Sequence, residues 1–409
     1  MKHILAKVAA ITICFLTVGV TEMPACTSVI VSGRVTADGR PLMLKVRDQS
    51  DAKRNTTVEF FEGEIYDFLG MVGDAATPHD RIKGFVGGYN TAGFCIMSLT
   101  AHGFPLDTAK HKGGVMTYAL SHCGSVEEFD EYVSGYVKTH VVISNIGVID
   151  AKGGAAYYEF GGHTYVKYDV NDPAVAPEGW RCCTNFCWSG DIHKGGGVDR
   201  WENAVWAMES LKKNADGKYE LRHNDLIDGI CRSYRQKRLG IESIEDLSGH
   251  PHFFDNGFIG YRNTCATMTI EGVAPGTDPK FTVMWLQLGH PACCPAFPCI
   301  LGDGDLLPPY IGQPTEYARL YADAMAIRDK YIYDEEYSTS KYFNVKNVQT
   351  LIRLSRKTES YIDGVFYPEY DKWVAGKVKD KEFYSGYRKM MPLFYDRFRS
   401  DFKDYSGLL

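Results

Sequence analysis

The pattern of apolar and polar positions predicts that strands dominate the first two thirds of the chain. Short apolar runs alternate with turns rich in glycine, asparagine and aspartate, as expected for antiparallel hairpins. The first predicted hairpin pairs 27–32 with 42–47 through a turn at Ala37-Asp38-Gly39. Further strands are expected at 83–89, 94–99, 143–150, 155–160, 164–169, 265–271 and 281–288.

Helical periodicity interrupts this pattern and takes over near the C-terminus. Ser125 followed by Glu128 predicts a capping box, beyond which apolar residues recur at helical spacing. Segments 201–211 and 224–236 are also expected to be helical, the second with Asn224 as its cap. From about residue 315 onward, patterning over 345–362 and 370–402 predicts further helices, with Tyr317 and Leu320 on the apolar face of the first turns.

These elements predict an α+β fold in which helices pack on a largely antiparallel sheet core. We expect three parts along the chain. They are a leader at 1–25, a core at 26–312 and a helical extension at 313–409 that packs on the core.

The first 25 residues have the pattern of a secretory signal peptide. Lys2 and Lys7 give a positive start, residues 8–20 are apolar and uncharged, and the small residue Ala25 precedes Cys26. We therefore expect an exported chain, periplasmic or extracellular, whose mature form begins at Cys26. The alternative is a lipoprotein signal, in which acylation of Cys26 would anchor the chain to lipid and block its α-amine.

Composition narrows the function classes. At 44% hydrophobic residues the chain can bury a large core, and a net charge of −6 offers no basic field for nucleic acid. Eleven of the 12 cysteines follow the leader, and their clusters lack the paired spacing of a zinc site. We expect no metal, no cofactor, a small-molecule substrate and burial of most cysteines as small apolar side chains.

Cys26 is the candidate nucleophile. Cleavage after Ala25 would give one residue both a thiol and a free α-amine, whose reference pKa of roughly 7.7–8.0 suits a general base. Lys45, Arg47 and Asp48 end the strand that pairs back toward Cys26. We expect Asp48 to hold the α-ammonium, and Arg47 or Lys45 to stabilise the thiolate by nearby positive charge.

Several segments resemble the N-terminal nucleophile hydrolases that cleave linear amides. That family includes choloylglycine hydrolases, penicillin V acylases, acyl-coenzyme A:6-aminopenicillanic acid acyltransferases and related secreted dipeptidases. The resemblance covers about 26 to 308. The segments that show the resemblance are, in order, Cys26-Thr27-Ser28-Val29-Ile30-Val31-Ser32-Gly33, Ala37-Asp38-Gly39, Lys45-Val46-Arg47-Asp48, Gly88-Tyr89-Asn90-Thr91-Ala92-Gly93-Phe94, Thr184-Asn185-Phe186 and Trp285-Leu286-Gln287-Leu288-Gly289-His290-Pro291.

The resemblance implies a four-layer αββα sandwich of two mainly antiparallel sheets, with acyl-transfer chemistry that needs no cofactor. It implies that Cys26 is the nucleophile and that its amine is the base. Asp48 would be the carboxylate near the amine, and Asn185 the side-chain donor to the oxyanion. Arg200 would match an arginine that supports the site. Enzymes of this kind commonly form homo-oligomers.

Two departures from the family pattern leave alternatives open. Bile-salt hydrolases carry Arg-Asn-x-Asp where this chain has Lys45-Val46-Arg47-Asp48, so either Lys45 or Arg47 can take the arginine role. A second asparagine expected after the Asn90 hairpin is absent. The expected function is hydrolysis of linear amides by an exported cysteine amidase. The alternatives are an acyltransferase or dipeptidase on the same machinery, or a non-catalytic lipoprotein.

Overall fold

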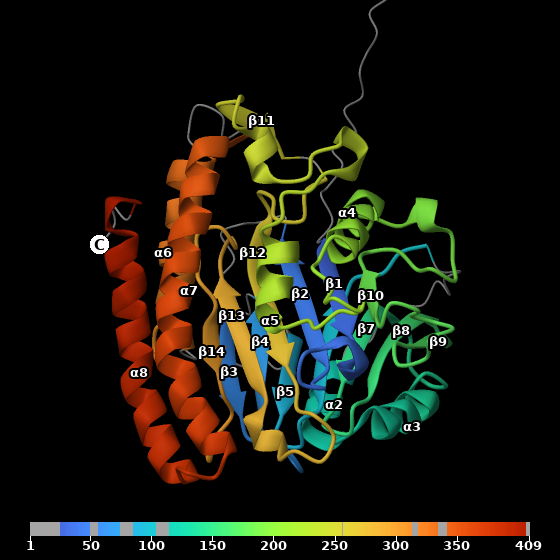
Figure 1. The fold of residues 1–409 in the computed structure, drawn as a ribbon. Coiled ribbons are helices and arrows are strands. Elements are labelled where there is room, and N and C mark those ends of the chain that lie inside the picture. Colours follow the sequence, from blue (N-terminus) through green and yellow to red (C-terminus); the bar gives the residue numbers. More distant parts are fainter. Residues whose placement is uncertain are drawn as a thin grey trace, which may run out of the picture.

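The computed structural model describes residues 25–49, 56–73, 85–103, 114–255, 257–312, 318–333 and 342–405. The predicted leader lies outside these ranges apart from Ala25. Within them the strands form a six-stranded sheet, a seven-stranded sheet and a small two-stranded pair, all antiparallel. The two large sheets lie one behind the other (Figure 1), which confirms the α+β prediction.

The six-stranded sheet carries the predicted hairpin at its centre, with strand order β10-β1-β2-β12-β13-β14. Cys26 lies opposite Arg47 in the ladder, and Ser28 lies opposite Lys45. Opposed residues share a face of an antiparallel pair, so these four side chains point to the same side. The strands are β1 (Cys26–Val31), β2 (Leu42–Asp48), β10 (Trp180–Cys183), β12 (Thr264–Glu271), β13 (Val283–Leu288) and β14 (Phe297–Cys299).

The seven-stranded sheet is a meander in which each strand pairs with the next along the chain. The predicted turn at Asn90 is confirmed, because its Oδ1 accepts from the backbone N–H groups of Ala92 and Phe94, and Gly93 adopts a φ of 75°. The strands are β3 (Thr56–Phe61), β4 (Phe68–Gly73), β5 (Phe85–Asn90), β6 (Cys95–Leu99), β7 (Val142–Ile149), β8 (Ala155–Gly162) and β9 (Tyr165–Asp169).

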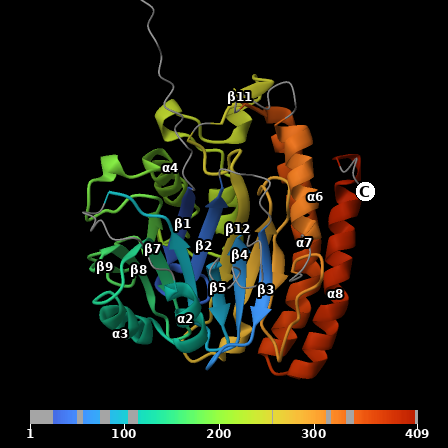
Figure 2. The same ribbon diagram turned by 180° about the vertical axis from the view of Figure 1, so that it is seen from behind.

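Helices cover the outer faces of both sheets (Figures 1 and 2). On one side, α2 (Val115–His122) and α3 (Val126–Tyr136) share a hydrophobic cluster with the seven-stranded sheet. On the other, α4 (Val198–Glu209) and α5 (His223–Leu226) share one with β1 and β2. A third and larger cluster fills the space between the sheets. The layers are therefore helix, sheet, sheet and helix, the αββα sandwich.

The cap of α3 differs in one detail from the prediction. Ser125 accepts from the backbone N–H of Glu128 at 3.3 Å, as a capping box requires. The Glu128 carboxylate, however, accepts from the backbone N–H of Gly124 at 2.7 Å instead of from that of Ser125. The hydrogen bond to the Glu128 side chain therefore comes from one residue earlier than in a capping box, and it still satisfies a backbone N–H ahead of the helix.

The helix predicted over 224–236 is shorter than expected. α5 begins at His223, a π-helical turn over Ile227–Cys231 ends it, and Tyr234 adopts a positive φ of 47° that no helix allows. The prediction of Asn224 as cap is wrong, because Asn224 lies inside the helix. The backbone N–H ahead of the helix, that of Arg222, is instead satisfied by the Asp225 carboxylate at 2.8 Å.

The C-terminal helices are α6 (Arg319–Ile327), α7 (Val345–Val374) and α8 (Asp380–Asp401). The predicted break between 362 and 370 is wrong, since α7 continues through Pro368. Burial of Phe366 and Tyr370 on either side outweighs the one backbone bond that proline removes. The turn comes instead at Gly376, whose φ of 69° favours glycine. Tyr317 lies outside the described residues.

α7 and α8 lie side by side along the β13–β14 end of the sandwich in both ribbon views (Figures 1 and 2). Their buried side chains belong to the same hydrophobic cluster as β12 and β13. Trp285 of β13, for example, meets Phe366 of α7 edge to face at 5.6 Å. The division into a core and a separate extension at 313 stays a prediction.

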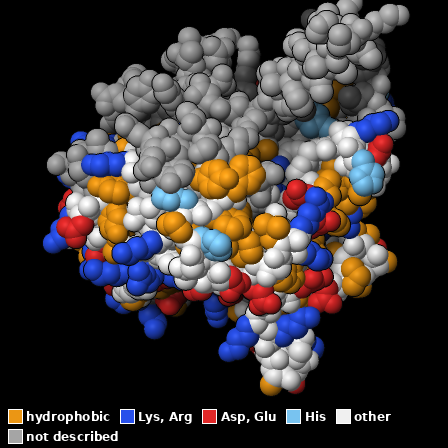
Figure 3. Space-filling model, turned by 90° about the horizontal axis from the view of Figure 1, so that it is seen from above, with side chains coloured by type: hydrophobic (Ala, Val, Ile, Leu, Met, Phe, Trp, Pro, Cys, Tyr) orange, Lys and Arg blue, Asp and Glu red, His pale blue; other side chains and the backbone are white. Residues whose placement is uncertain are grey.

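The surface carries charges of both signs. On the face seen from above, Lys and Arg side chains are interspersed with Asp and Glu, and hydrophobic side chains lie between them (Figure 3). Among the described helices, none has both the length and the apolar character needed to cross a bilayer.

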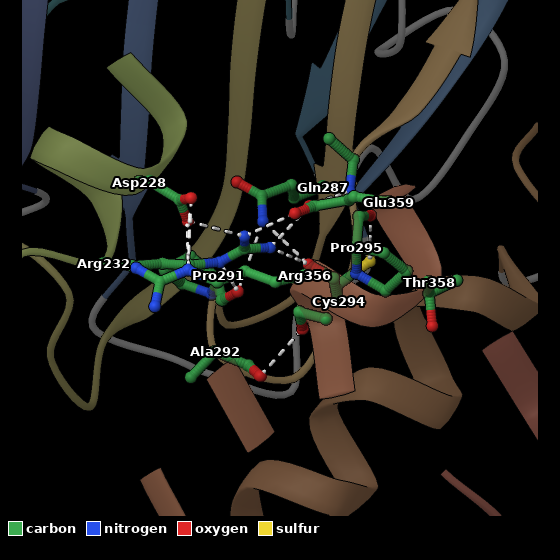
Figure 4. Close-up of polar contacts among 12 residues, drawn as sticks. Asp228, Arg232, Gln287, Pro291, Ala292, Cys294, Pro295, Arg356, Thr358 and Glu359 are labelled. Atoms are coloured by element: carbon green, nitrogen blue, oxygen red, sulfur yellow. Dashed lines mark hydrogen bonds and ion pairs between the residues drawn. The ribbon is translucent and has the colours of Figure 1, made fainter. Parts of the chain in front are cut away.

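A buried ion pair joins α7 to the loop after β13 (Figure 4). Glu359 accepts from both terminal nitrogens of Arg232 at 2.7 Å and from the backbone N–H of Ala296 at 2.7 Å. Arg232 also donates to the carbonyls of Pro291 at 2.8 Å and Cys294 at 3.0 Å. Because both charges are paired and hydrogen-bonded, the pair fixes the position of α7 against this loop.

We predict that Glu359→Ala lowers the free energy of unfolding by about 3–5 kcal/mol, because Arg232 is then left with its ion pair to Asp228 at 3.2 Å and the backbone N–H of Ala296 loses its acceptor. Arg356→Ala is the control, since Arg356 pairs with Asp228 at 3.1 Å where both side chains are exposed. It should cost less than about 1 kcal/mol. Urea titration of each variant measures both values. Equal losses would show that the buried pair does not hold α7.

Candidate active site

Cys26 lies at the start of β1, an inner strand between β10 and β2. Ile30, on the same face of the strand, belongs to the cluster between the sheets. Val29, on the opposite face, belongs to the cluster under α4 and α5. The Cys26 side chain therefore points into the space between the sheets, where the residue is 7% exposed.

Lys45 is the basic residue that contacts the sulfur. Its Nζ donates to Cys26 Sγ at 3.4 Å and also contacts the backbone carbonyl of Ser98. Lys45 is 1% exposed, so little water separates the two groups. An ammonium in such a position stabilises a neighbouring thiolate electrostatically.

Arg47 lies directly opposite Cys26 in the ladder, yet its guanidinium turns toward other strands. Nη1 donates to Thr56 Oγ1 of β3 at 2.7 Å and to Cys265 Sγ of β12 at 3.0 Å. The sequence left open which of Lys45 and Arg47 stands at the thiol. The contact to the sulfur is made by Lys45.

The backbone of Cys26 contacts the two residues expected from distant parts of the chain. The Cys26 N–H donates to Asn185 Oδ1 at 2.8 Å, and Arg200 Nη2 donates to the same oxygen at 2.9 Å. Arg200 Nη1 donates to the Cys26 carbonyl at 2.7 Å and to Thr27 Oγ1 at 2.9 Å. The structure thus brings Asn185 and Arg200 together at residue 26.

Asn185 turns its oxygen, not its NH₂ group, toward residue 26. Its Nδ2 donates to the Thr100 carbonyl at 2.8 Å. The assignment of Asn185 as oxyanion donor therefore stays a prediction.

Asn145 is a site residue to which the sequence pattern gave no role. Its Nδ2 donates to the carbonyl of Phe186 at 2.8 Å and to that of Thr184 at 3.3 Å, on either side of Asn185. Asn145 is fully buried in β7, so it fixes the backbone that carries Asn185. A single amide within an otherwise apolar strand was the only signal that could have pointed to it.

Asp48 ends β2 on the face opposite to Cys26 and is fully buried. Its Oδ1 accepts from Thr264 Oγ1 at 2.7 Å. Its Oδ2 has no hydrogen-bond partner and lies 3.7 Å from Arg200 Nη1. Burial raises the pKa of Asp48 to about 7, although the charge of Arg200 acts in the opposite direction. The backbone N–H of Asp48 donates to the Ala25 carbonyl at 2.9 Å, beside the bond expected to be cleaved.

The cysteines other than Cys26 form no second centre in the described part of the chain. None of the eleven described cysteines forms a disulfide, and all of them are buried. No cluster of three or more His, Cys, Asp or Glu side chains suited to a metal ion occurs among the described residues. The prediction that most thiols are buried as small apolar side chains is confirmed.

Comparison with known proteins returned structural neighbours only. No protein-family model and no curated protein matches the chain. Penicillin V acylase from Agrobacterium tumefaciens aligns with a TM-score of 0.39 and 13% identity, over 68% of this chain and 86% of the other. A mutant conjugated bile acid hydrolase from Clostridium perfringens aligns with a TM-score of 0.41 and 12% identity, over 68% and 92%. At this level, the similarities assign neither a family nor a reaction.

Asp48 should make stability depend on pH in the chain that retains residue 25. Its pKa is raised from 3.8 to about 7, so the folded protein keeps a proton that the unfolded chain has lost in this window. The free energy of unfolding should therefore fall as pH rises from 5 to 7, by about 2 kcal/mol more in the wild type than in Asp48→Asn. Denaturant titrations of both proteins at the two pH values measure this difference. Parallel pH profiles would contradict it.

Proposed function

We propose that this protein is a cysteine amidase of the N-terminal nucleophile type, which hydrolyses linear carbon–nitrogen amide bonds in small molecules. One observation carries the proposal, and it concerns Cys26. Its sulfur accepts a hydrogen bond from Lys45 Nζ, and its backbone nitrogen donates one to Asn185 Oδ1. Both atoms of Cys26 that the chemistry requires are therefore already held in place.

Cleavage between Ala25 and Cys26 converts the backbone nitrogen of residue 26 into a primary amine. This amine takes the thiol proton, and Lys45 stabilises the resulting thiolate. The thiolate attacks the amide carbonyl, and collapse of the tetrahedral adduct expels the amine, which takes the proton from the α-ammonium. Water then attacks the thioester and releases the acid, which restores the thiol. The scheme requires no cofactor.

Asn185 supplies the oxyanion donor in this scheme. Its NH₂ group carries two hydrogens, and the Thr100 carbonyl uses one of them. The second is available to the developing oxyanion, while Arg200 holds the Asn185 oxygen from the other side. The amide can therefore support the nucleophile and the oxyanion from one position.

Asp48 and Arg200 orient the amine. The Asp48 Oδ2 atom lacks a donor in the chain that retains Ala25. The α-ammonium formed by cleavage is a donor of the right charge at the neighbouring strand end. Arg200 fixes the Cys26 carbonyl at 2.7 Å, so the end of β1 keeps its position after the leader is lost.

The position of the sulfur favours the amidase over a lipoprotein. A diacylglyceryl group on Cys26 would have to occupy the space between the sheets, where the residue is 7% exposed and contacts Lys45. Removal of the leader, and with it export, is part of the proposal, because the amine exists only after cleavage.

We predict that Cys26→Ala lowers the rate of amide hydrolysis by about 10³-fold or more. Retention of Ala25 should have a similar effect, because the base is then a peptide nitrogen. The substrates to test are glycine and taurine conjugates of bile acids, penicillin V, N-acyl amino acids and dipeptides. Assays with an added acceptor amine distinguish acyl transfer from hydrolysis.

Cys123→Ala is the matched control, because Cys123 is a buried thiol in the cluster under α2 and α3 and should leave turnover unchanged. Mass spectrometry of the mature N-terminus accompanies the assays. Turnover by Cys26→Ala, or a lipid on Cys26, would refute the proposal.

A further inference from the structure

Arg47 is a buried cation that has no counterion among the described residues. Arg47 is 3% exposed, and both partners of its Nη1 are neutral groups, the hydroxyl of Thr56 and the thiol of Cys265. Burial raises the pKa of Cys265, so this thiol stays protonated at neutral pH. The Arg47 Nε atom has no hydrogen-bond partner. No described carboxylate forms an ion pair with this guanidinium.

The other buried arginines of the described chain each have a carboxylate. Arg200 lies 3.7 Å from Asp48, and Arg232 lies 2.7 Å from Glu359. Arg328, at 2% exposure, lies 2.5 Å from Asp329. An unpaired charge in such surroundings destabilises the folded protein, because it has lost water without gaining a partner. Arg47 therefore differs from its three counterparts by the anion that it lacks.

The side chain of Arg47 lies on the same face of β2 as the nucleophile and packs against a glycine. Gly73, at the end of β4, faces it so closely that a Cβ there would lie 2.3 Å from Nη2. Directly opposed residues of an antiparallel pair have Cα atoms about 4.5–5.5 Å apart, and Arg47 opposes Cys26. An anion on the guanidinium would thus lie on the same side of β2 as the thiolate, in the space between the two sheets.

We infer that Arg47 is a specificity-determining residue that binds a carboxylate of the amide substrate. The inference rests on the proposed role of Cys26 as nucleophile. Lys45 contacts the sulfur, so the second cation of β2 is available to the substrate. A carboxylate presents two oxygens to the planar guanidinium, and its charge supplies the missing counterion. The preferred substrates are therefore amides that carry an acidic group near the scissile bond.

The test compares two alkylating reagents of nearly equal shape, anionic iodoacetate and neutral iodoacetamide. Each forms a carbon–sulfur bond to Cys26 and expels iodide, so no amide turnover is needed and a failure is distinct from failure of the amidase scheme. Mass spectrometry of the Cys26 peptide gives both rates. We expect Arg47→Gln to lower the ratio of the iodoacetate rate to the iodoacetamide rate by about 10-fold or more.

Arg353→Gln is the matched control, because Arg353 is an exposed arginine of α7 whose bonds are to Gln349 and Thr350. It removes the same charge and should leave the ratio unchanged. Arg47→Lys keeps the charge without the planar fork and should lower the ratio by a smaller factor than Arg47→Gln. An unchanged ratio in Arg47→Gln, or an equal fall in both rates, would overturn the inference.

A measurement on the wild type decides the question if Arg47→Gln does not fold. Benzoate should protect Cys26 from iodoacetamide at concentrations at least about 10-fold lower than benzamide does, because only benzoate carries the charge that Arg47 lacks. Equal protection by the two compounds would overturn the inference.

Discussion

The register between β1 and β2 decides what surrounds residue 26. Cys26 opposes Arg47 and Ser28 opposes Lys45, so the thiol and both cations face the space between the sheets. Asp48 faces the other side. A shift of one residue would exchange these faces, because side chains alternate along a strand. The strand pairing therefore separates the sulfur chemistry from the carboxylate that faces Arg200.

Two buried cations, which no carboxylate of the described ranges pairs with, give the inner side of this strand end its electrostatic character. Lys45 contacts the sulfur, and Arg47 donates hydrogen bonds to the hydroxyl of Thr56 and the thiol of Cys265. Together they favour negative charge in their surroundings, whether on a thiolate or on a bound carboxylate. The same pair of charges thus connects activation of the proposed nucleophile with selection of the proposed substrate.

The outer side of the strand end is organised differently. Arg200 of α4 bonds to the Cys26 carbonyl, to Thr27 and to Asn185, and it lies beside Asp48. One side chain thereby connects the strand, the loop that follows β10 and the helix layer. Asn145 of the opposite sheet holds the backbone on both sides of Asn185. The site consequently depends on both sheets and on the packing of α4.

The sequence by itself determined the elements that depend on neighbours along the chain. It predicted the first hairpin, the Asn90 turn, the strands β7, β8 and β9 and the start of α3, because turn residues and alternation act locally. It also brought Cys26, Lys45, Arg47 and Asp48 together as site residues. It could not decide between Lys45 and Arg47, since two residues of one strand separated by a single position share a face.

Only the tertiary structure decided the contacts made over long distances in the sequence. The bonds of Cys26 to Asn185 and Arg200, at separations of 159 and 174 residues, depend on how β1, the loop after β10 and α4 pack together. Sequence pointed to Asn185 and Arg200 through resemblance alone, and it gave no role to Asn145. For the same reason, the sequence could not predict where α7 ends or that Arg47 has no carboxylate partner among the described residues. Burial and pairing are properties of three-dimensional packing, which no local pattern of residues specifies.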